Sequence, residues 1–400
     1  MDNNLRETIS QEVLFAREAA QFLNISMQRL NQLVHTGQLK PLKKSPAGTL
    51  FLKKDLEERK KSLTNIGEDL KTSKEVKKLK INTAYLNEAV NYFTIQAFCG
   101  YSDKKAEPIF KEISKELDLT QPLLKFNYDI AQILKTEVSK IDKLYENTIK
   151  GFEKLNDDDF IVKRGTNPYP VLLDKTNEAP PYLFMRGNVD LLNEKIVSVV
   201  GTRNPSNEGR ERAYRLSKLL GRYGIVVASG LARGIDTAAH TAALENNQLT
   251  IAVIGTPIIK AYPKENEKLQ RQIIEKGLVI SQFAPSAPVQ RWHFPMRNAI
   301  MSGISLATAI IEAGETSGAL KQANYALKQG RIVFIPQSAL DNPNITWPKN
   351  YIKRPGAVKF SKIEDLLAEL ERSKIITDPS SCQFSLFSEG AESLYVHRVK

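Results

Sequence analysis

The sequence predicts an α/β protein with a doubly wound, mostly parallel sheet, preceded by a small winged helix–turn–helix domain and a helical region. Two patterns predict this architecture. From residue 196 onward, six short apolar runs alternate with amphipathic helical segments, which is typical of a parallel sheet covered by helices on both faces. Residues 1–64 show two short helical patterns followed by a strand–turn–strand pattern.

The composition favours a polyanionic partner. The 400 residues contain 57 Lys and Arg against 45 Asp and Glu, which gives a formal net charge of +12. The two cysteines, Cys99 and Cys382, lie far apart, which excludes a disulfide scaffold and a Cys-based zinc finger. No apolar run approaches the ~20 residues that span a bilayer, and the N-terminus lacks a signal-peptide core. We therefore expect a cytoplasmic protein that does not contact a membrane.

Residues 1–64 predict a domain that reads duplex DNA. Helices are expected over 15–22 and 27–34, strands over 39–42 and 49–52, and a last helix from 55 to about 63. In this geometry the second helix enters the major groove and the wing lies on the backbone. The polar face of that helix carries side chains of the types that read base edges: Gln28, Arg29, Asn31 and Gln32. Lysines flank the wing, where phosphates would lie: Lys40, Lys43, Lys44, Lys53 and Lys54.

This segment resembles the excisionase/MerR-like winged helix–turn–helix family. The resemblance depends on Ala16-Arg17-Glu18-Ala19-Ala20, Ile25-Ser26, Gly37-Gln38-Leu39 and Asp55-Leu56. It implies binding to a duplex operator. The alternative is a small helical protein-binding domain with a solvated basic surface.

Residues 65–155 are charged, poor in glycine and predicted to be helical. One apolar stripe recurs at three-, four- and five-residue steps and predicts a helix of roughly 30 residues. The stripe consists of Phe126, Ile130, Ile133, Val138, Ile141, Tyr145, Ile149 and Phe152. Such a stripe usually packs on its own domain, and the alternative is a self-associating helix that would make the protein a homodimer.

The α/β region covers residues 160–372, and a tail follows over 373–400. Strands are expected over 196–200, 225–228, 250–254, 278–280, 306–311 and 331–335, with helices after Gly209 and from about 236, 264 and 317. The carboxyl ends of such strands form the ligand crevice. Small residues that let backbone N–H groups approach a phosphate cluster there: Gly201, Thr202, Ser229, Gly230, Gly234, Gly255, Ser317 and Gly318.

Arginine is the chemical signature of this crevice. Arg203 and Arg233 lie in loops at strand ends and are the best candidates for phosphate, whereas Arg212, Arg215 and Arg222 fit solvated helix faces. Trp292, His293 and Phe294 lie between Arg291 and Arg297. They form either a stacking platform for single-stranded bases or an apolar closure of the sheet edge.

The same region offers little for catalysis. The dinucleotide fingerprint G-x-G-x-x-G and the P-loop are absent, so no nucleotide cofactor is expected, and no metal site is expected either. Asp236, His240 and Glu312 are the candidates for acid–base work near strand ends, without a nucleophile–base–orienter set. We expect a protein that is not an enzyme.

Several segments in residues 169–368 resemble the DprA/Smf DNA-processing family. The most specific is the run from Ser229 to His240, Ser-Gly-Leu-Ala-Arg-Gly-Ile-Asp-Thr-Ala-Ala-His. The others are Tyr169-Pro170-Val171-Leu172-Leu173, residues 180–187, Val200-Gly201-Thr202-Arg203-Asn204-Pro205-Ser206, residues 250–255, Tyr262-Pro263, Phe294-Pro295-Met296-Arg297-Asn298, Glu312-Ala313 and Ser317-Gly318.

The resemblance implies an extended Rossmann fold that binds single-stranded DNA, dimerises and helps to load a RecA-type recombinase without catalysis. It implies that phosphates bind at Gly201-Thr202-Arg203 and at basic residues around the crevice, with Lys264 and Lys268 in that set. Arg297 and Asn298 complete the expected site with the small residues named above. The chain departs from the family pattern at Gln282, Ala299, the stretch 319–323 and Gln337. With the N-terminal domain, these departures favour a regulator, a mobile-element protein or a defence protein as alternatives to a transformation protein.

Two further functions compete with single-strand binding. The core is distantly similar to LOG-type phosphoribohydrolases, in which Arg297 and Glu312 would hold and cleave an N-glycosidic bond, although Ala313-Gly314-Glu315-Thr316 replaces the signature of that family. A transcription factor whose core senses a nucleotide is the other alternative. In the tail, Gln383, Phe384, Leu386 and Phe387 resemble the pentapeptide that binds the bacterial sliding clamp; the alternative is a strand packed on the core.

Overall fold

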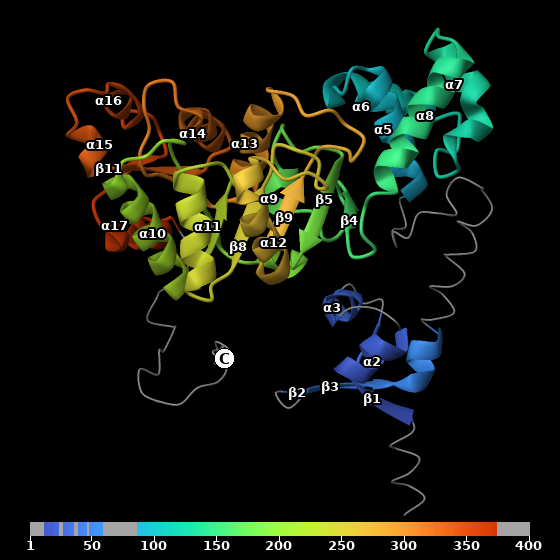
Figure 1. Cartoon of the computed structure of the whole chain (residues 1–400), viewed down its shortest axis with the longest axis horizontal. Helices are drawn as coiled ribbons and strands as arrows, with labels where there is room; N and C mark the ends of the chain where they lie inside the picture. Colours follow the sequence, from blue (N-terminus) through green and yellow to red (C-terminus); the bar gives the residue numbers. More distant parts are fainter. Residues whose placement is uncertain (1–11, 24–26, 36–38, 46–47, 59–85, 374–400) are drawn as a thin grey trace, which may run out of the picture.

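The computed structural model describes residues 12–23, 27–35, 39–45, 48–58 and 86–373 (Figure 1). At the N-terminal end, β1 (Val13–Phe15), β2 (Lys43–Ser45) and β3 (Gly48–Leu52) form an antiparallel sheet in the order β1-β3-β2. Two helices, α2 (Ala16–Leu23) and α3 (Met27–His35), pack on it through buried Ala19, Leu30 and Leu33.

Two details of this unit differ from the expectation. The first strand of the hairpin covers Lys43–Ser45 rather than residues 39–42, because Pro41 has no N–H to donate and pairing begins with the bond from Leu42 N to Leu50 O at 2.8 Å. The unexpected strand β1 pairs with β3. The final helix covers 53–58 within the described residues, and its Leu56 is buried in the same core.

The middle region is not one long helix, so that prediction is wrong. The apolar stripe is divided between α7 (Asn127–Ile133) and α8 (Val138–Phe152). Lys135, at the break, has a φ of +51°, which no helix accepts, and Thr136 N bonds back to Ala131 O at 2.9 Å. The five-residue step from Ile133 to Val138 was the sequence signal of this break.

The stripe packs on its own molecule. Ile141, Tyr145 and Phe152 are buried in one hydrophobic cluster with α5 (Leu86–Phe98) and with strand residues such as Phe184. Ring centroids of Phe152 and Phe184 lie 5.7 Å apart, and each buried ring contributes about 1.5–3 kcal/mol. The helical region therefore shares its core with the sheet instead of forming a separate linker.

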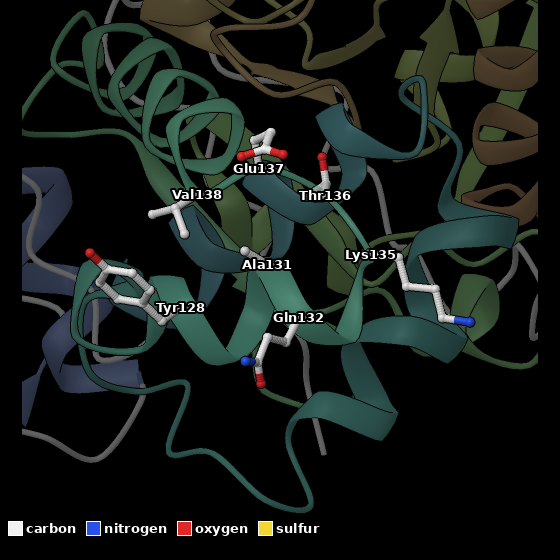
Figure 2. Close-up of a pocket in the computed structure, with 7 residues that line it drawn as sticks. All are labelled: Tyr128, Ala131, Gln132, Lys135, Thr136, Glu137 and Val138. Carbon is white, nitrogen blue, oxygen red and sulfur yellow. The ribbon is translucent and has the colours of Figure 1, made fainter.

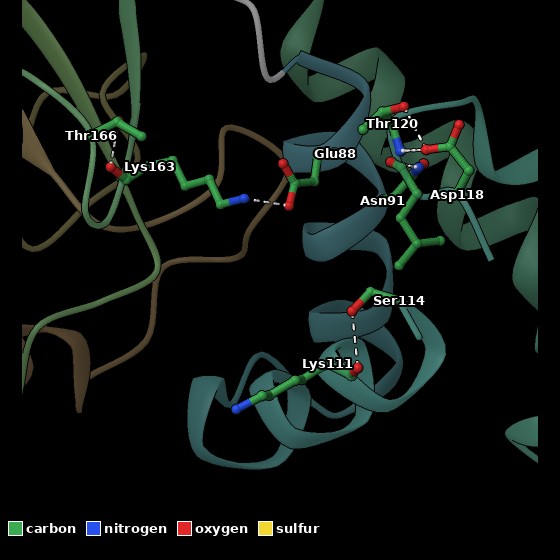
Figure 3. A network of polar contacts seen from close by, with 9 residues as sticks. Glu88, Asn91, Lys111, Ser114, Asp118, Thr120, Lys163 and Thr166 are labelled. Atoms are coloured by element: carbon green, nitrogen blue, oxygen red, sulfur yellow. Dashed lines mark hydrogen bonds and ion pairs between the residues drawn. The ribbon is translucent and has the colours of Figure 1, made fainter. Parts of the chain in front are cut away.

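Polar contacts fix the irregular parts of this helical unit (Figure 3). Asn91 of α5 donates from Nδ2 to Leu119 O at 2.8 Å and to Gln121 O at 2.7 Å. These bonds anchor the segment that follows α6 (Asp103–Ile113) and precedes η2 (Leu123–Phe126). Lys163 Nζ, on the sheet, lies 2.7 Å from Glu88 Oε1 on α5. The helical unit is thus joined to the sheet by an ion pair as well as by apolar packing.

The main sheet has nine strands in the order β12-β11-β10-β6-β7-β8-β9-β5-β4. The strands from β12 to β9 run parallel, and β5 and β4 are antiparallel additions at one edge. Their bounds are β4 (Phe160–Lys163), β5 (Tyr182–Gly187), β6 (Ile196–Val200), β7 (Val226–Ser229), β8 (Thr250–Val253), β9 (Leu278–Ser281), β10 (Ala307–Ile310), β11 (Ile332–Pro336) and β12 (Ala357–Phe360). The predicted mostly parallel α/β sheet is confirmed, and β4, β5 and β12 were not anticipated.

Helices cover both faces of this sheet. On β7, Val227 packs with α10 (Asn207–Arg222), α11 (Ile235–Glu245) and α17 (Ile363–Arg372), whereas its neighbours Val226 and Ala228 face α13 (His293–Ile304) and α14 (Gly318–Lys328). Figure 1 shows α10, α11 and α12 (Glu267–Lys276) in front of the strands. The short elements α9 (Val171–Asp174), η3 (Val189–Asn193), η4 (Lys264–Asn266), α15 (Gln337–Leu340) and α16 (Trp347–Tyr351) complete the fold.

Candidate nucleic-acid interface

The site lies where the chain reverses the direction in which strands are added. After β6 the chain adds β7, β8 and β9 on one side, and then β10, β11 and β12 on the other. In open parallel sheets, ligands bind outside the carboxyl ends of the strands at this switch point. The turn after β6 meets the end of β10 there, because Thr202 N donates to Glu312 O at 2.7 Å.

Glu312 holds this turn in place through its carboxylate. Ser206 N donates to Oε1 at 3.0 Å and Ser206 Oγ donates to Oε2 at 2.6 Å. Ser206 also caps α10 by accepting from Gly209 N at 3.0 Å. Both carboxylate oxygens of Glu312 therefore accept hydrogen bonds that position the turn. The phosphoribohydrolase alternative would require these oxygens to be free for chemistry.

Gly234 lets the start of α11 approach the same turn. Its φ is +77°, and a Cβ there would lie 2.5 Å from Thr202 O and 2.6 Å from Arg203 O. Ile235 N donates to Thr202 O at 3.3 Å. Residues 201–203 are thus enclosed between the start of α11 and the end of β10, which leaves the side chain of Arg203 exposed.

Arg203 forms a cluster with two aromatic rings, which we call the Arg203 cluster: Arg203, Tyr262 and Phe294. The guanidinium carbon lies 5.8 Å from the Phe294 ring centroid, and the rings of Phe294 and Tyr262 are 5.3 Å apart. Tyr262 is 51% exposed, and Trp292, two residues before Phe294, is 53% exposed. An exposed cation thus lies with the exposed ring of Tyr262 and the half-buried ring of Phe294 at the carboxyl ends of the strands.

Residues 292–294 were predicted to be either a stacking platform or an apolar closure, and the structure gives different residues different environments. His293 is buried and stacks on Phe283 with ring centroids 3.8 Å apart, and burial lowers its pKa to about 4. Trp292 is exposed and Phe294 is partly exposed within the Arg203 cluster. The histidine closes the apolar layer, while the two larger rings remain accessible.

Arg233 is exposed and paired with Glu265. Arg233 Nη2 donates to Glu265 Oε2 at 2.7 Å, and this hydrogen bond raises the pKa of the guanidinium. Sequence reasoning missed Glu265, and its only signal was its position next to Lys264. Lys264 on η4 and Lys268 on α12 are exposed nearby in sequence, and buried Asn266 anchors the Arg233 loop by donating to Leu231 O at 2.9 Å.

Arg297 lies beneath the crevice instead of facing it. Its side chain is 5% exposed, and Nη1 donates to the carbonyls of Gly230 and, at 2.5 Å, of Val253. Burial lowers its pKa to about 10, opposed by the nearby carboxylate of Asp236. Asp236 accepts from Gly230 N at 3.1 Å; burial raises its pKa, and Arg297 opposes that shift. The pair braces the ends of β7 and β8, a role that the sequence analysis did not identify.

Other predicted residues also make internal contacts. Ser229 Oγ is buried and donates to Val199 O at 2.7 Å. Asn298 Nδ2 donates to Gly318 O at 3.2 Å, and Ser317 caps α14 by accepting from Ala319 N at 3.3 Å. Gly318 is exposed, with no atom within 4 Å of its Cβ position.

The histidine proposed for acid–base work is in the interior. His240 Nδ1 lies 2.8 Å from Thr250 Oγ1. Burial lowers its pKa to about 3, so the ring is neutral at physiological pH.

In the N-terminal unit, four predicted contacts are exposed: Asn31, Lys40, Lys43 and Lys44. The side chains of Gln28, Arg29 and Gln32 lie outside the described residues, as do Gln383, Phe384, Leu386 and Phe387 of the tail. In the part of the chain that the structure describes, no helix is long and apolar enough to cross a membrane.

The similarity to known proteins covers the same part of the chain. Residues 160–371 match the family model for DNA recombination-mediator protein A. The chain is 37% identical over 213 residues to DNA processing protein DprA of Bacillus subtilis and 41% identical over 204 residues to that of Streptococcus pneumoniae. These alignments cover 53% and 51% of this chain and 71% of each relative.

A solved structure agrees with these matches. The X-ray structure of DprA from Streptococcus pneumoniae aligns with a TM-score of 0.55 and 30% identity, covering 72% of this chain and 98% of that one. The chain belongs to the DNA recombination-mediator protein A family.

Proposed function

We propose that this protein binds single-stranded DNA at the carboxyl ends of β6, β7, β8 and β10 and acts in DNA processing and recombination. The observation that carries the proposal is the Arg203 cluster, an exposed guanidinium over Phe294 beside the exposed ring of Tyr262. A guanidinium matches phosphate oxygens in pairs, and exposed rings stack on bases of any sequence. The two together suit a flexible, charged strand with accessible bases.

The candidate residues divide into two groups by exposure. Those proposed to meet the strand directly are Gly201, Thr202, Arg203, Arg233, Gly234, Lys264, Lys268, Ser317 and Gly318. Those proposed to hold the strand ends beneath it are Ser229, Gly230, Arg297 and Asn298. In this proposal the DNA is bound without a chemical step, since the groups considered for catalysis are engaged in structural hydrogen bonds.

Fluorescence anisotropy with a labelled poly-dT oligonucleotide tests the proposal. We expect Arg203→Ala to weaken binding about tenfold and to reduce its salt dependence, because one phosphate contact and its aromatic support are removed. Arg215→Ala is the matched control, since Arg215 is 65% exposed on α10 and faces Glu211. Wild-type protein that does not bind poly-dT, or equal effects of the two substitutions, would refute the proposal.

We also propose that the N-terminal unit is a winged helix–turn–helix domain that binds duplex DNA. Exposed Lys40, Lys43 and Lys44 on and before β2 support a phosphate-contacting wing. A strand bound in the crevice would then change the affinity for an operator. Equal operator affinity with and without saturating oligonucleotide would exclude this coupling.

We propose a cytoplasmic homodimer that cooperates with a RecA-type recombinase. Residues 383–387 are the proposed contact with a sliding clamp, and they lie outside the described residues. Clamp pull-down by the intact protein, compared with Phe384→Ala plus Phe387→Ala, tests that contact.

A further inference from the structure

A cavity of about 650 Å³ lies between the helical unit and the sheet. It is lined by α6, by the loop before β5, by the residue that follows β9, and by α13 and α14. This volume falls within the ~300–1,000 Å³ of ordinary small-molecule sites. None of the residues in its lining belongs to the DNA-contacting set proposed above.

One buried side chain in this cavity has no partner. Gln282, directly after β9, is 6% exposed and lines the cavity, yet its amide makes no hydrogen bond to any residue between 86 and 373. The amide is open to the cavity, so a guest there can pair with it. A ligand with both an acceptor and a donor would satisfy it.

Carboxylates supply further acceptors. Tyr92 and Gln96 both donate to Oδ1 of Asp103, at 2.7 and 2.5 Å, and leave its Oδ2 without a hydrogen bond from residues 86–373. Glu178 accepts from Gln329 Nε2 at 3.0 Å through one oxygen. Both acidic residues line the cavity. A guest that donates from an amine can reach oxygens that the protein leaves free.

The remaining walls suit a flat apolar ring. Pro180, Met296 and Ala299 line the cavity together with the aromatic ring of Tyr325. Lys104 and Lys111, both exposed on α6, lie at its rim and can meet a phosphate. An arginine side chain is a poorer match, because a guanidinium has no acceptor for the Gln282 amide and the two lysines repel it.

We propose that this cavity binds a nucleobase with an exocyclic amine, carried on a nucleotide; adenine and cytosine are the bases tested and thymine, which lacks the amine, is the comparison. The amine donates to the free carboxylate oxygens, and a ring nitrogen or carbonyl oxygen accepts from Gln282. The nucleotide comes either from the bound single strand or from free solution. The strand source depends on the proposed single-strand binding, since Met296 lies on the same helix as Phe294 of the Arg203 cluster.

Two matched measurements test the proposal. Anisotropy with dA20, dC20 and dT20 oligonucleotides gives the preference for amine-bearing bases, and ligand-detected NMR with dAMP, dCMP and dTMP tests free nucleotides. We expect dA20 or dC20 to lose about tenfold in affinity in Gln282→Leu, with dT20 unchanged, because one base contact discriminates by about that factor. Ala299→Leu, which narrows the cavity, is the second variant.

Gln132→Leu is the matched control. Gln132 is exposed on α7 beside Tyr128 and Thr136 in a shallow depression of the helical unit (Figure 2). Circular dichroism melting of each variant confirms that the protein is folded. The control should change neither the base preference nor nucleotide binding.

The outcomes separate the two proposals. If the cavity variants lose the base preference only with oligonucleotides, the bound strand supplies the base. If they lose binding only of free dAMP or dCMP, the free nucleotide supplies it. If no probe distinguishes the cavity variants from wild type, or if arginine amide binds there and dAMP does not, the cavity proposal is overturned. A wild-type protein that binds none of dA20, dC20 and dT20 refutes single-strand binding but leaves the free-nucleotide measurement to decide the cavity proposal.

Discussion

The guanidinium of Arg297 occupies the space in which a side chain on Gly230 would lie: a Cβ built at that glycine overlaps the guanidinium carbon and nitrogens. Arg297 at the same time donates to the carbonyls of Gly230 and Val253. A buried cation thus replaces a side chain at the end of β7. The glycine is required by the approach of Arg297, since its φ lies outside the left-handed region.

We predict that Gly230→Ala lowers the free energy of unfolding by about 1–3 kcal/mol, the usual effect of an added group in a packed core. The methyl group would push Arg297 away from two carbonyls and from Asp236. Urea denaturation followed by circular dichroism measures the change. Gly314→Ala is the control and should stay within about 0.5 kcal/mol, because nothing lies within 4 Å of its Cβ position. Equal midpoints for both variants would contradict the bracing role of Arg297.

Neutralising Glu265 should strengthen binding to single-stranded DNA. Glu265 is hydrogen-bonded to Arg233 and raises the pKa of its guanidinium, so its carboxylate competes with phosphate for this cation. We expect Glu265→Gln to raise the affinity for poly-dT about threefold at low salt, and the gain to shrink at high salt.

Glu267→Gln separates this local effect from the change in net charge. Glu267 is paired with Arg271 on the next turn of α12. If both variants bind equally well, the gain comes from net charge alone and Arg233 is not a DNA contact.

The stability of the fold should fall as the pH is lowered from 7 to 5. Burial holds the pKa of His240 at about 3 and that of His293 at about 4, below the ordinary value near 6.5. Between these values the unfolded chain binds protons that the folded protein does not, so stability rises with pH in this window. At pH 5 each histidine costs about 2 kcal/mol relative to pH 7.

Chemical denaturation at several pH values between 5 and 7 measures this dependence. His293→Phe keeps the stacking on Phe283 and removes one titrating group. As the pH is lowered, the free energy of unfolding of this variant should fall less steeply than that of the wild type. The two slopes against pH should differ by the contribution of about one proton. An unchanged slope would mean that His293 is protonated in the folded protein.

The two lysines of β2 should affect duplex binding alone. Lys43 and Lys44 are exposed, and each proposed phosphate contact contributes about 0.9 to the slope of log affinity against log salt. We expect Lys43→Ala plus Lys44→Ala to reduce this slope for duplex DNA by about two and to leave poly-dT binding unchanged. Lys349→Ala plus Lys353→Ala, two exposed lysines of the main domain, is the control. A parallel loss of poly-dT binding would show that β2 is not a separate duplex contact.

The apolar pattern of the sequence predicted the six parallel strands from β6 to β11. Apolar runs such as Ile196–Val200 are buried on both faces, so their hydrophobicity reports their position directly, and the glycines that end them mark the turns. The edge strand β12 was not predicted because Ala357 and Val358 are half-buried and Lys359 is exposed, so it lacks a continuous apolar run. The break at Lys135 was missed because an apolar stripe continues on both sides of it, and the five-residue step between Ile133 and Val138 was its one signal in the stripe.

The tertiary structure alone decided what the polar residues of the crevice do. Arg203 and Arg297 are the same residue type near strand ends, yet one is exposed over Phe294 and the other is buried against the carbonyls of Gly230 and Val253. The direction of a long side chain depends on hydrogen-bond partners that are distant in sequence, 67 residues away for Gly230. Periodicity records which face of an element is buried, because burial depends on local spacing. It carries no information about which distant carbonyl a buried cation will meet.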